Sequence, residues 1–376
     1  MTVEYSTGLG KKLVATCIRE NIPYAVQMEL TSKCNLKCRH CYMVNDNDVE
    51  LSSEEIKDII DQLVDMGTFY LSFTGGEIFT RDDLFEIARY ASRKGFFLTF
   101  MTNGALITAE MMDEIRTLKL IKFELSLYGA TAKTHDHITR VAGSFERTVA
   151  AIKDLVKAGI EVTVKTSLMN LNIHESDDLK AMCEQLGVRH RISAGIAPMK
   201  NGSLEPQQYD LSFEDMERYL PRHDFDLSYL IEIGEKDPAH RFKCKAGNAA
   251  CSVSPSGIVC PCVMMPMAVG NLRERSFKEI WHMQPSEELK RLRNLTSADL
   301  PVCSKCDLAQ YCIRCPGVVY LETGDIVGAS PSACRYAQWR GSSQVTVMQS
   351  PGFEPGGITK NQKEVIKKED ETRRIQ

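Results

Sequence analysis

Cysteine is the residue type whose number and spacing point to chemistry in this sequence. The chain of 376 residues has 14 cysteines, and three of them lie together at Cys34, Cys38 and Cys41. Nine more lie between Cys244 and Cys334. In a reducing compartment so many thiols seldom form disulfides, so these clusters indicate metal binding.

The first cysteine cluster lies in the segment TSKCNLKCRHCY, residues 31–42, with the spacing C-x3-C-x2-C. Three thiolates in one short loop can bind three corners of a cubane iron–sulfur cluster and leave the fourth iron for another ligand. A zinc ion would need a fourth protein ligand, and the candidate, His40, directly precedes Cys41. The spacing therefore favours an iron–sulfur cluster, with zinc as the alternative.

The second cysteine-rich region has the spacing C-x6-C-x8-C-x1-C over residues 244–262. It continues with C-x2-C-x5-C-x2-C over residues 303–315 and a last cysteine at Cys334. Eight of these nine thiolates suffice for two more cubane clusters. The two C-x2-C pairs also admit two zinc knuckles. The remaining cysteines, Cys17 and Cys183, are expected to be ordinary buried residues.

Alternating strand and helix patterns surround the first cluster and must position it. Short apolar segments predict six strands, at residues 25–30, 69–73, 97–101, 122–127, 161–167 and 189–194. Helical periodicity predicts five helices between or after them, at residues 52–66, 82–94, 109–118, 144–158 and 176–186. Ser52 is the expected N-cap of the first helix, and four glycines are expected to end helices: Gly67, Gly95, Gly159 and Gly187.

Six strand–helix units in series predict a parallel sheet, open or curled into a partial barrel, in a chain of the α/β class. Its ligand site should lie at the carboxyl ends of the strands. The predicted organisation is an N-terminal segment (1–23), the sheet domain (24–200), a bridging segment (201–243), a small cysteine-rich domain (244–340) and a flexible tail (341–376). The bridge carries one expected helix at 212–220, and the small domain carries one at 276–292.

Composition excludes several classes of protein. The formal net charge is −4 with a pI near 6.1, so no basic surplus exists to neutralise a nucleic-acid backbone. No apolar run reaches the roughly 18 residues that a membrane helix needs, and the N-terminus lacks a secretory signal. We therefore expect a cytoplasmic protein that has neither a nucleic acid nor a membrane as its partner.

Further motifs at the strand ends resemble those of the radical S-adenosylmethionine (SAM) superfamily. After the cysteine loop come Thr74-Gly75-Gly76-Glu77, Thr102-Asn103-Gly104 and Ser126-Leu127-Tyr128-Gly129, and then the run THDHITRVAGSF at 134–145. The resemblance implies SAM-binding roles for Gly75, Gly76, Glu77, Asn103, Ser126 and Arg140. The structural alternatives are a helix cap for Ser126, a surface ion pair for Arg140, and helix capping for His135 and Asp136.

The resemblance also implies a fold and a mechanism. The fold would be a partial (β/α)6 TIM-like barrel. Cys34, Cys38 and Cys41 would hold a [4Fe–4S] cluster whose open iron binds SAM, and reductive cleavage of SAM would give a 5′-deoxyadenosyl radical. That radical removes a hydrogen atom from the substrate, and the protein's contribution is positioning and exclusion of water.

The second region resembles the SPASM domain, which extends many radical SAM enzymes and holds auxiliary [4Fe–4S] clusters. The resemblance assigns Cys244, Cys251, Cys262 and Cys315 to auxiliary cluster I. It assigns Cys303, Cys306, Cys312 and Cys334 to auxiliary cluster II, which makes three clusters in all. Cys260 is left over, either as a replacement for Cys251 or as a free thiol, and the interval between Cys312 and Cys315 is one residue shorter than usual.

The family resemblance favours a ribosomally made peptide as substrate, with a cross-link or a related modification as the product. A separate leader-binding protein is an expected partner, because only 33 residues precede Cys34. An electron donor such as flavodoxin or ferredoxin is another. The alternatives are haem-type tetrapyrrole side-chain chemistry and a non-enzymatic iron–sulfur electron-transfer or scaffold protein. Val263 stands where sulfatase-maturing relatives carry an Asp base, which disfavours their reaction.

Overall fold

The computed structural model describes residues 8–44, 49–118, 120–222 and 244–342. The predicted tail over 341–376 lies outside the described residues apart from its first two positions. The second half of the predicted bridge over 201–243 also lies outside them.

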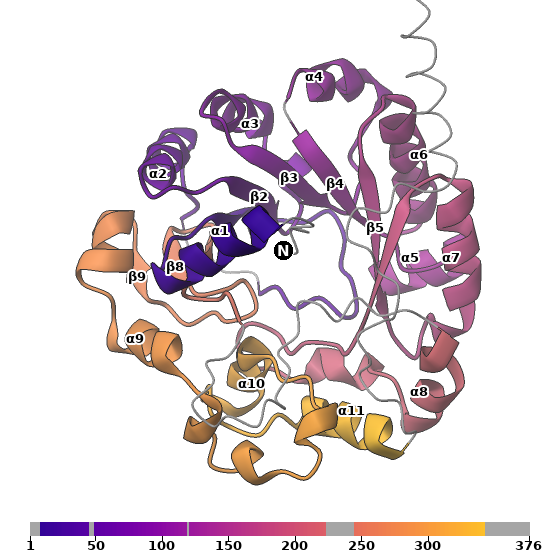
Figure 1. The fold of residues 1–376 in the computed structure, drawn as a ribbon. Helices are drawn as coiled ribbons and strands as arrows, with labels where there is room; N and C mark the ends of the chain where they lie inside the picture. The colour runs from indigo at the N-terminus through magenta and orange to yellow at the C-terminus, as the bar shows by residue number, and fades with distance from the viewer. Residues whose placement is uncertain (1–7, 45–48, 119, 223–243, 343–376) are drawn as a thin grey trace, which may run out of the picture.

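Six parallel strands form one curved sheet, as the sequence predicts (Figure 1). Neighbours in the sheet are neighbours in the chain, and each strand pairs in parallel with the next. The sheet is open, because β6 lies at one edge and does not meet the other. The strands are β1 (Ala25–Thr31), β2 (Tyr70–Gly75), β3 (Phe97–Thr102), β4 (Leu120–Ser126), β5 (Val162–Leu168) and β6 (Arg189–Ala194).

Helices cover the convex face of this sheet (Figure 1). All five were predicted to within a few residues, and they are α2 (Ser53–Asp65), α3 (Leu84–Arg93), α4 (Met112–Thr117), α6 (Ser144–Lys157) and α7 (Ser176–Gln185). Ser52 caps α2 as expected, since its hydroxyl accepts the Glu55 N–H and the Glu55 carboxylate accepts the Ser52 N–H. The four glycines predicted to end helices all have positive φ, between 69° and 90°.

Alternation along the strands separates the helix-covered face from the concave face. In β1, Val26, Met28 and Leu30 join one apolar core with the side chains of α2. Gln27 and Glu29 point the other way, because successive residues of a strand face opposite sides. The polar side chains of the sheet therefore gather on the concave face, where a ligand would lie.

Two helices were not predicted. α1 (Gly8–Arg19) packs through Cys17 against Tyr24, Ala25 and Ala249, so Cys17 is an ordinary buried residue as expected. α5 (Ala132–Thr139) lies in the polar run after β4 and is capped by Thr131. Its sequence AKTHDHIT lacks the apolar repeat that predicts a helix.

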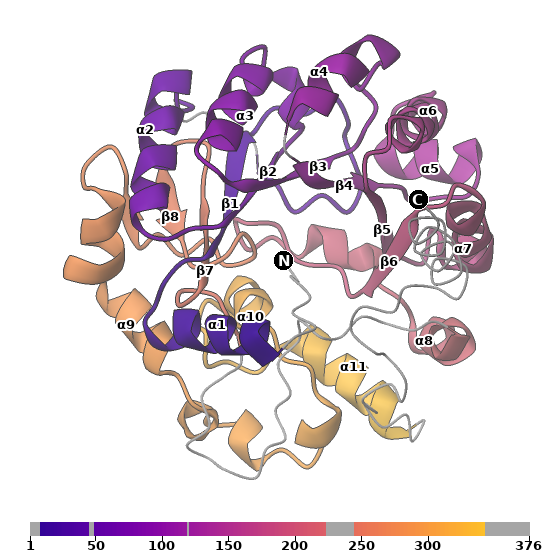
Figure 2. The ribbon, with the colours of Figure 1, turned by 45° about the horizontal axis from the view of Figure 1, so that its top comes forward.

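The cysteine-rich region extends the same sheet (Figure 2). Its first strand, β7 (Ala250–Val253), pairs in parallel with β1, and β8 (Ile258–Cys260) and β9 (Gly270–Asn271) follow antiparallel. The sheet order is β6-β5-β4-β3-β2-β1-β7-β8-β9. The two predicted domains are thus joined by backbone hydrogen bonds.

The single helix expected at 276–292 was wrong. A short π-helical segment, Glu279–Met283, ends before Pro285, and α9 (Glu287–Asn294) begins after it with Ser286 as N-cap. Proline lacks an N–H and disfavours a helical residue before it, so one helix cannot pass through. Two further helices were not predicted, α10 (Pro316–Thr323) and α11 (Pro331–Ser342).

The cysteine-rich region also contacts the part of the chain that follows β6. The predicted helix at 212–220 is present as α8 (Phe213–Tyr219), and it lies beside α11 (Figure 1). Tyr336 and Trp339 of α11 share an apolar cluster with Met216 of α8. The Tyr336 hydroxyl donates to the Asp210 carboxylate at 2.8 Å. The second region therefore contacts the six-stranded sheet at both ends: it pairs with β1, and it packs near β6 and α8.

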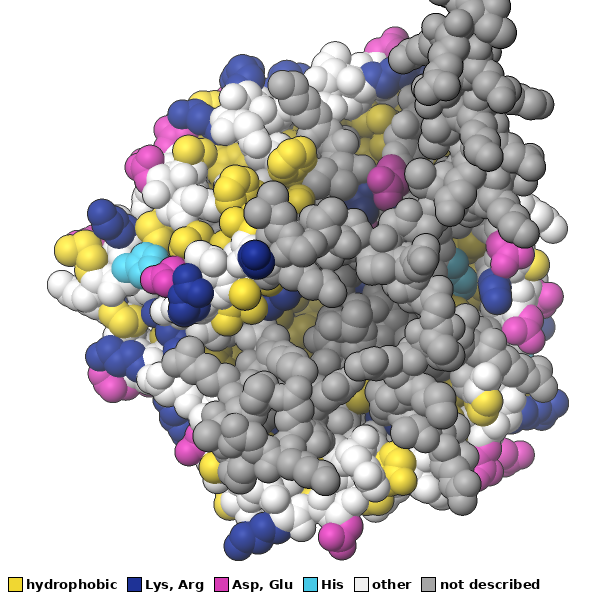
Figure 3. All heavy atoms as spheres, viewed as in Figure 1, with side chains coloured by type: hydrophobic (Ala, Val, Ile, Leu, Met, Phe, Trp, Pro, Cys, Tyr) yellow, Lys and Arg dark blue, Asp and Glu magenta, His cyan; other side chains and the backbone are white. Residues whose placement is uncertain are grey.

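Charged side chains on the face shown in Figure 3 are scattered around its rim, with both signs mixed. In the part of the chain that the structure describes, no helix is both long and apolar enough to cross a membrane.

Candidate functional site

The three cysteines of the first loop follow the carboxyl end of β1, and their thiols interact electrostatically. Burial raises the pKa of the Cys38 thiol, and the neighbouring Cys41 and Cys34 thiols raise it further. Three thiolates held this close repel one another unless a cation compensates them. Iron cations would supply that charge and would keep the coordinating thiols deprotonated. The donor set therefore fits the predicted cluster.

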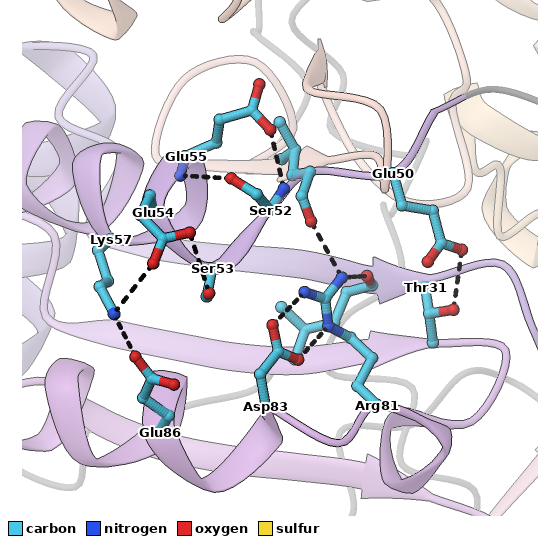
Figure 4. A network of polar contacts seen from close by, with 12 residues as sticks. Thr31, Glu50, Ser52, Ser53, Glu54, Glu55, Lys57, Arg81, Asp83 and Glu86 are labelled. Carbon is cyan, nitrogen blue, oxygen red and sulfur yellow. Dashed lines mark hydrogen bonds and ion pairs between the residues drawn. The ribbon is translucent and has the colours of Figure 1, made fainter.

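The start of the cysteine loop is held by Glu50, which closes back onto the end of β1. Its Oε1 accepts hydrogen bonds from the Thr31 hydroxyl at 2.8 Å and the Ser32 N–H at 2.9 Å. Figure 4 shows the contact with Thr31. These bonds lower the pKa of Glu50 although burial raises it, so the carboxylate stays charged.

Arg81 ties the two ends of the loop together (Figure 4). Its Nη1 donates to the Leu30 carbonyl at 3.0 Å and to the Leu51 carbonyl at 3.1 Å. The Asp83 carboxylate holds the guanidinium in place through two further hydrogen bonds of 2.8 and 2.6 Å. Both ends of the cysteine loop are thereby fixed to one side chain.

The middle of the loop is bound to the C-terminus of α5. Lys37 N donates to Thr139 O at 3.1 Å, and Arg39 N donates to Ile138 O at 3.0 Å. The Arg39 Nε donates to His137 O at 3.0 Å. The last carbonyls of a helix lack partners within it, so the loop satisfies them. The unpredicted helix α5 thus positions the cysteines.

The two glycines after β2 pack against the backbone of the cysteine loop. A Cβ on Gly75 would lie 2.3 Å from Thr31 O, and one on Gly76 would lie 2.2 Å from Lys33 O. Gly76 N donates to Thr31 O and Glu77 N donates to Lys33 O, each at 2.8 Å. The lack of a Cβ at both glycines therefore lets the cysteine loop pack closely, and the approach of SAM that the family resemblance implies there stays a prediction.

Glu77 is fully buried. Its carboxylate accepts from the Thr102 hydroxyl at 2.6 Å, the Asn103 N–H at 2.7 Å and the Phe79 N–H at 3.1 Å. Burial raises its pKa, and these hydrogen bonds oppose the rise. The carboxylate therefore points at the end of β3, and its role toward the SAM ammonium stays a prediction.

Asn103 is a predicted SAM-binding residue whose side chain lies against the cysteine loop. Its Nδ2 donates to Asn35 Oδ1 at 2.8 Å and lies 3.9 Å from Cys34 Sγ. Its Oδ1 accepts from Ala105 N at 2.8 Å. Glu77 holds its backbone, so the glycine-glutamate motif and the end of β3 form one unit with the cysteines.

Ser126 and Arg140 occupy different positions relative to this unit. Ser126 hydrogen-bonds Tyr128, whose buried hydroxyl lies near Cys38, so the end of β4 reaches the cysteine loop. Arg140 ends α5 with φ of 60°, and its side chain is exposed. Among the described residues, no hydrogen bond or ion pair engages its guanidinium. The surface ion pair considered for Arg140 is therefore absent from this part of the chain.

His135 and Asp136 have structural roles, as the capping alternative predicted for Asp136. The Asp136 carboxylate accepts from Gly143 N at 2.7 Å and Phe145 N at 2.9 Å, at the start of α6. The His135 ring accepts the Tyr128 N–H at 3.1 Å, and burial lowers its pKa to about 4. Both residues thus hold the segment between β4 and α6.

The cysteines of the second region separate into two groups. In the first group, burial raises the pKa of Cys244 to about 12, and the nearby Cys315 and Cys262 thiols contribute. In the second group, burial raises the pKa of Cys312 to about 12, and the nearby thiols are Cys334, Cys303 and Cys306. The thiols that act on Cys244 do not include Cys251, so the ligand sets that the family resemblance implies stay a prediction.

Strand alternation places Cys251 and Cys260 on opposite faces of the sheet. Cys251 is in register with Val26 and lies in the helix-covered core. Cys260 stands opposite Ser252, on the concave face. Burial raises the pKa of the Cys251 thiol, and the Cys260 and Cys262 thiols raise it further.

Side-chain geometry bears on the zinc alternative. Within the described ranges, no three Cys, His, Asp or Glu side chains converge closely enough to hold a single metal ion. Zinc requires its ligands at one point, about 2.3 Å from each sulfur, whereas the thiolates of a cubane each bind a different iron. His40, the candidate zinc ligand, packs its ring edge-on against Tyr128 at 4.5 Å.

A cavity of about 320 Å³ lies between the first cysteine loop and the cysteines of β8 and its following turn. Two charged residues that sequence reasoning missed, Glu29 and Lys200, form an ion pair at its wall, with Lys200 Nζ 2.6 Å from Glu29 Oε2. A lone carboxylate within an apolar strand is the signal that would have found Glu29. The other lining residues are Ser32, Met43, Val44, Glu50, Asn201, Ser252, Ser254, Pro255, Ser256, Ile258, Cys260, Cys262, Val263 and Pro266.

Comparison with known families agrees with both resemblances. Residues 28–186 match the radical SAM superfamily. Residues 244–307 match SPASM, an iron–sulfur cluster-binding domain. The second match ends before Cys312, Cys315 and Cys334.

Several characterised proteins are similar to the chain. The AdoMet-dependent heme synthase of Methanosarcina barkeri is 30% identical over 83% of this chain and 96% of its own length. The mycofactocin maturase MftC of Mycobacterium tuberculosis is 31% identical over 77% of each chain. The crystal structure of Streptococcus suis SuiB bound to its precursor peptide SuiA aligns with a TM-score of 0.64 at 18% identity. That alignment covers 87% of this chain and 80% of SuiB, and it shows a shared fold.

Proposed function

The chain belongs to the radical SAM superfamily and carries a SPASM domain, and on that premise we propose that it modifies a ribosomally made peptide. Members of this superfamily are enzymes, which sets aside the non-enzymatic carrier. The proposed product is a cross-link or a related change. The proposed units are the barrel over residues 24–200 and the auxiliary-cluster domain over residues 244–340.

The first cysteine loop would hold the cluster that binds SAM. When bound, the cluster and SAM supply a 5′-deoxyadenosyl radical that removes a hydrogen atom from the substrate. Gly75 and Gly76 let the loop pack closely enough to present the three thiols. Glu50 and Arg81 clamp the two ends of the loop and would keep those thiols in place for the cluster.

Residues at the strand ends would bind SAM around that loop. Asn103 has its side-chain amide beside Cys34, and Ser126 reaches the loop through Tyr128. Arg140 has an exposed guanidinium and is suited to a carboxylate. Glu77 acts indirectly in this proposal, since it holds the backbone of Asn103.

The observation that carries the peptide proposal is the cavity beside the loop. Its volume of about 320 Å³ lies at the lower end of the usual range for small-molecule sites, roughly 300 to 1,000 Å³. A peptide can insert one reacting residue and leave the remainder outside, whereas a tetrapyrrole must bring in a whole macrocycle. Serines and the Glu29–Lys200 pair would orient a peptide backbone there.

Val263 lines this cavity, which agrees with the expectation that a base is missing at that position. Glu29 lies on the same wall and is a carboxylate, but Lys200 binds both of its oxygens. Its proton-accepting capacity is thereby reduced. The proposed reaction accordingly needs no base at position 263.

A second candidate function is haem-type tetrapyrrole chemistry. The observation in its favour is the similarity to heme synthases, which extends over 96% of the Methanosarcina barkeri protein. The MftC and subtilosin AlbA proteins, which are 31% and 28% identical, favour the peptide instead. An electron donor such as flavodoxin or ferredoxin, and a leader-binding protein, belong to the peptide proposal.

The test is anaerobic incubation of reduced enzyme and SAM with candidate peptides, followed by mass spectrometry. A cross-link should lower the peptide mass by about two units, the mass of two hydrogens. The control is the full-length variant with Cys34, Cys38 and Cys41 replaced by Ala, which should leave every peptide unchanged. Turnover of a tetrapyrrole with no peptide changed would replace the proposal by the second candidate.

A further inference from the structure

Three arginines direct their guanidinium groups toward the two auxiliary cysteine groups. Arg314 and Arg340 are buried, with 1% and 8% of their surface exposed. Arg293 is partly buried, and its Nη2 is enclosed without a hydrogen-bond partner among the described residues. Guanidinium groups are seldom buried without compensating anions. A negative charge at the cysteines would therefore stabilise these three guanidinium groups.

Arg314 lies between the two groups. Its guanidinium hydrogen-bonds Cys303 and interacts electrostatically with Cys312, both of the second group, and with Cys315 of the first. Its Nη2 also donates to the Gly328 carbonyl at 3.0 Å and to the carbonyl of Ile326. The two carbonyls thus hold the guanidinium in place, and its positive charge lies near the cysteines of both groups.

The other two arginines each face one group. Arg293 interacts with Cys251, and it lines a small void together with Cys244. Its Nε and Nη1 donate to Gly247 O at 2.7 Å and Trp281 O at 2.9 Å, which directs Nη2 elsewhere.

Arg340 interacts with Cys312, and its Nη1 donates to Tyr311 O at 3.0 Å. The nearby groups of other kinds are Lys245, beside Cys244, and Glu322, which faces Cys315 and Cys334.

A cation at this place changes the redox behaviour of a cluster. A cluster held by four thiolates gains one negative charge when it takes up one electron, and a nearby buried cation stabilises the reduced form. Cluster potentials respond to net charge and to hydrogen bonds onto the sulfurs. The effect is strong in a buried site, where water screens little.

We propose that Arg314 is a cation shared by the two auxiliary clusters and raises the reduction potential of both. Arg293 raises the reduction potential of the first auxiliary cluster alone, and Arg340 raises the reduction potential of the second alone. This rests on the proposed function, because it takes the two cysteine groups as cluster sites. Clusters tuned in this way are better acceptors of a single electron.

The experiment uses the full-length chain with Cys34, Cys38 and Cys41 replaced by Ala, so that the remaining iron signals are auxiliary. Anaerobically reconstituted protein is titrated with dithionite and redox mediators, and each signal is followed by electron paramagnetic resonance. Additional replacement of Cys306 and Cys334 by Ala assigns the signals, since it should remove only the second. The variants are Arg314→Gln, Arg293→Gln and Arg340→Gln, with exposed Arg291→Gln as the matched control.

At a fixed potential, Arg314→Gln should lower the ratio of reduced to oxidised cluster at least tenfold at both sites, which is 59 mV for a one-electron couple. Arg293→Gln should move the first signal only, Arg340→Gln the second only, and Arg291→Gln neither. Arg314→Lys keeps the charge and should recover part of the shift.

Unchanged potentials in Arg314→Gln at normal iron content would overturn the proposal. If that variant loses its iron, the potentials of Arg293→Gln and Arg340→Gln test the proposal instead. A shift in the cluster that the arginine does not face, or no shift in either cluster, would refute the proposal. A parent protein that binds far fewer than about eight iron atoms would contradict the cluster assignment of the proposed function instead.

Discussion

Gly76→Ala tests whether the glycines after β2 serve the cysteine loop. The new Cβ would lie 2.2 Å from Lys33 O, 2.6 Å from its carbonyl carbon and 2.7 Å from Ser32 O. All three atoms belong to the backbone of the loop that carries the cysteines, so no side-chain rotation relieves the overlap. The loop must move away from β2.

The cost can be estimated from the contacts that would be lost. Overpacking costs about 1 to 3 kcal/mol, and the hydrogen bonds of Gly76 N and Glu77 N contribute about 1 kcal/mol each. We expect a loss of about 3 kcal/mol in the free energy of unfolding, concentrated at the loop. Iron per chain should fall by about one third, because only the first of three clusters loses its site.

The assay measures iron and SAM binding on anaerobically reconstituted protein. Gly159→Ala is the control, since its φ of +77° imposes a strain of about 1 to 2 kcal/mol while its Cβ would meet nothing within 4 Å. The control should keep all of its iron. If Gly76→Ala keeps full iron and loses only SAM affinity, the glycine serves close approach of the cofactor, and our reasoning is refuted.

The remaining predictions concern metal content, pH and the cavity. Reconstituted protein should bind about twelve iron atoms, and replacing Cys34, Cys38 and Cys41 by Ala should remove about a third of them and all SAM cleavage; stoichiometric zinc in place of iron would contradict this. Burial raises the pKa of Glu124, but the stronger effect of Lys165 and Lys122 brings it down to about 2. Its charge therefore stabilises the fold above its unfolded pKa of about 4.5, and this contribution is lost as the pH falls toward 2. Glu124→Gln should be less stable than wild type in denaturant titrations at pH 7, and the gap should narrow as the pH falls below 4.5; a constant gap would show that charge is not the cause. Lys200→Met should cost about 3 kcal/mol because it removes the cation that binds both oxygens of the buried Glu29 carboxylate, and adding Glu29→Gln should recover part of that loss. Strictly additive losses in this double-mutant cycle would show that the pair does not interact.

Local patterns in the sequence determined the parallel sheet and its helices. The apolar segments predicted all six strands of the sheet, and Ser52 and the glycines at helix ends were read from the residues themselves. Such features depend on neighbours within a few positions, so they are encoded locally. Cysteine spacing likewise predicted the group of three thiols in the first loop, whereas the division of the later cysteines into two sets came from the family resemblance. α5 escaped prediction because tertiary contacts, rather than an apolar repeat, hold it in place.

Tertiary structure decided how the residues of the site face one another. The sequence pattern does not show that β7 pairs with β1 and β8 with β7, and these two pairings together place Cys251 and Cys260 on opposite faces. Glu29 and Lys200 stand 171 residues apart and meet only because the chain after β6 returns to β1. The carboxylate of Glu77 turns toward β3 because strand neighbours supply its donors. Burial and long-range pairing set these orientations, and neither is encoded within a local window of sequence.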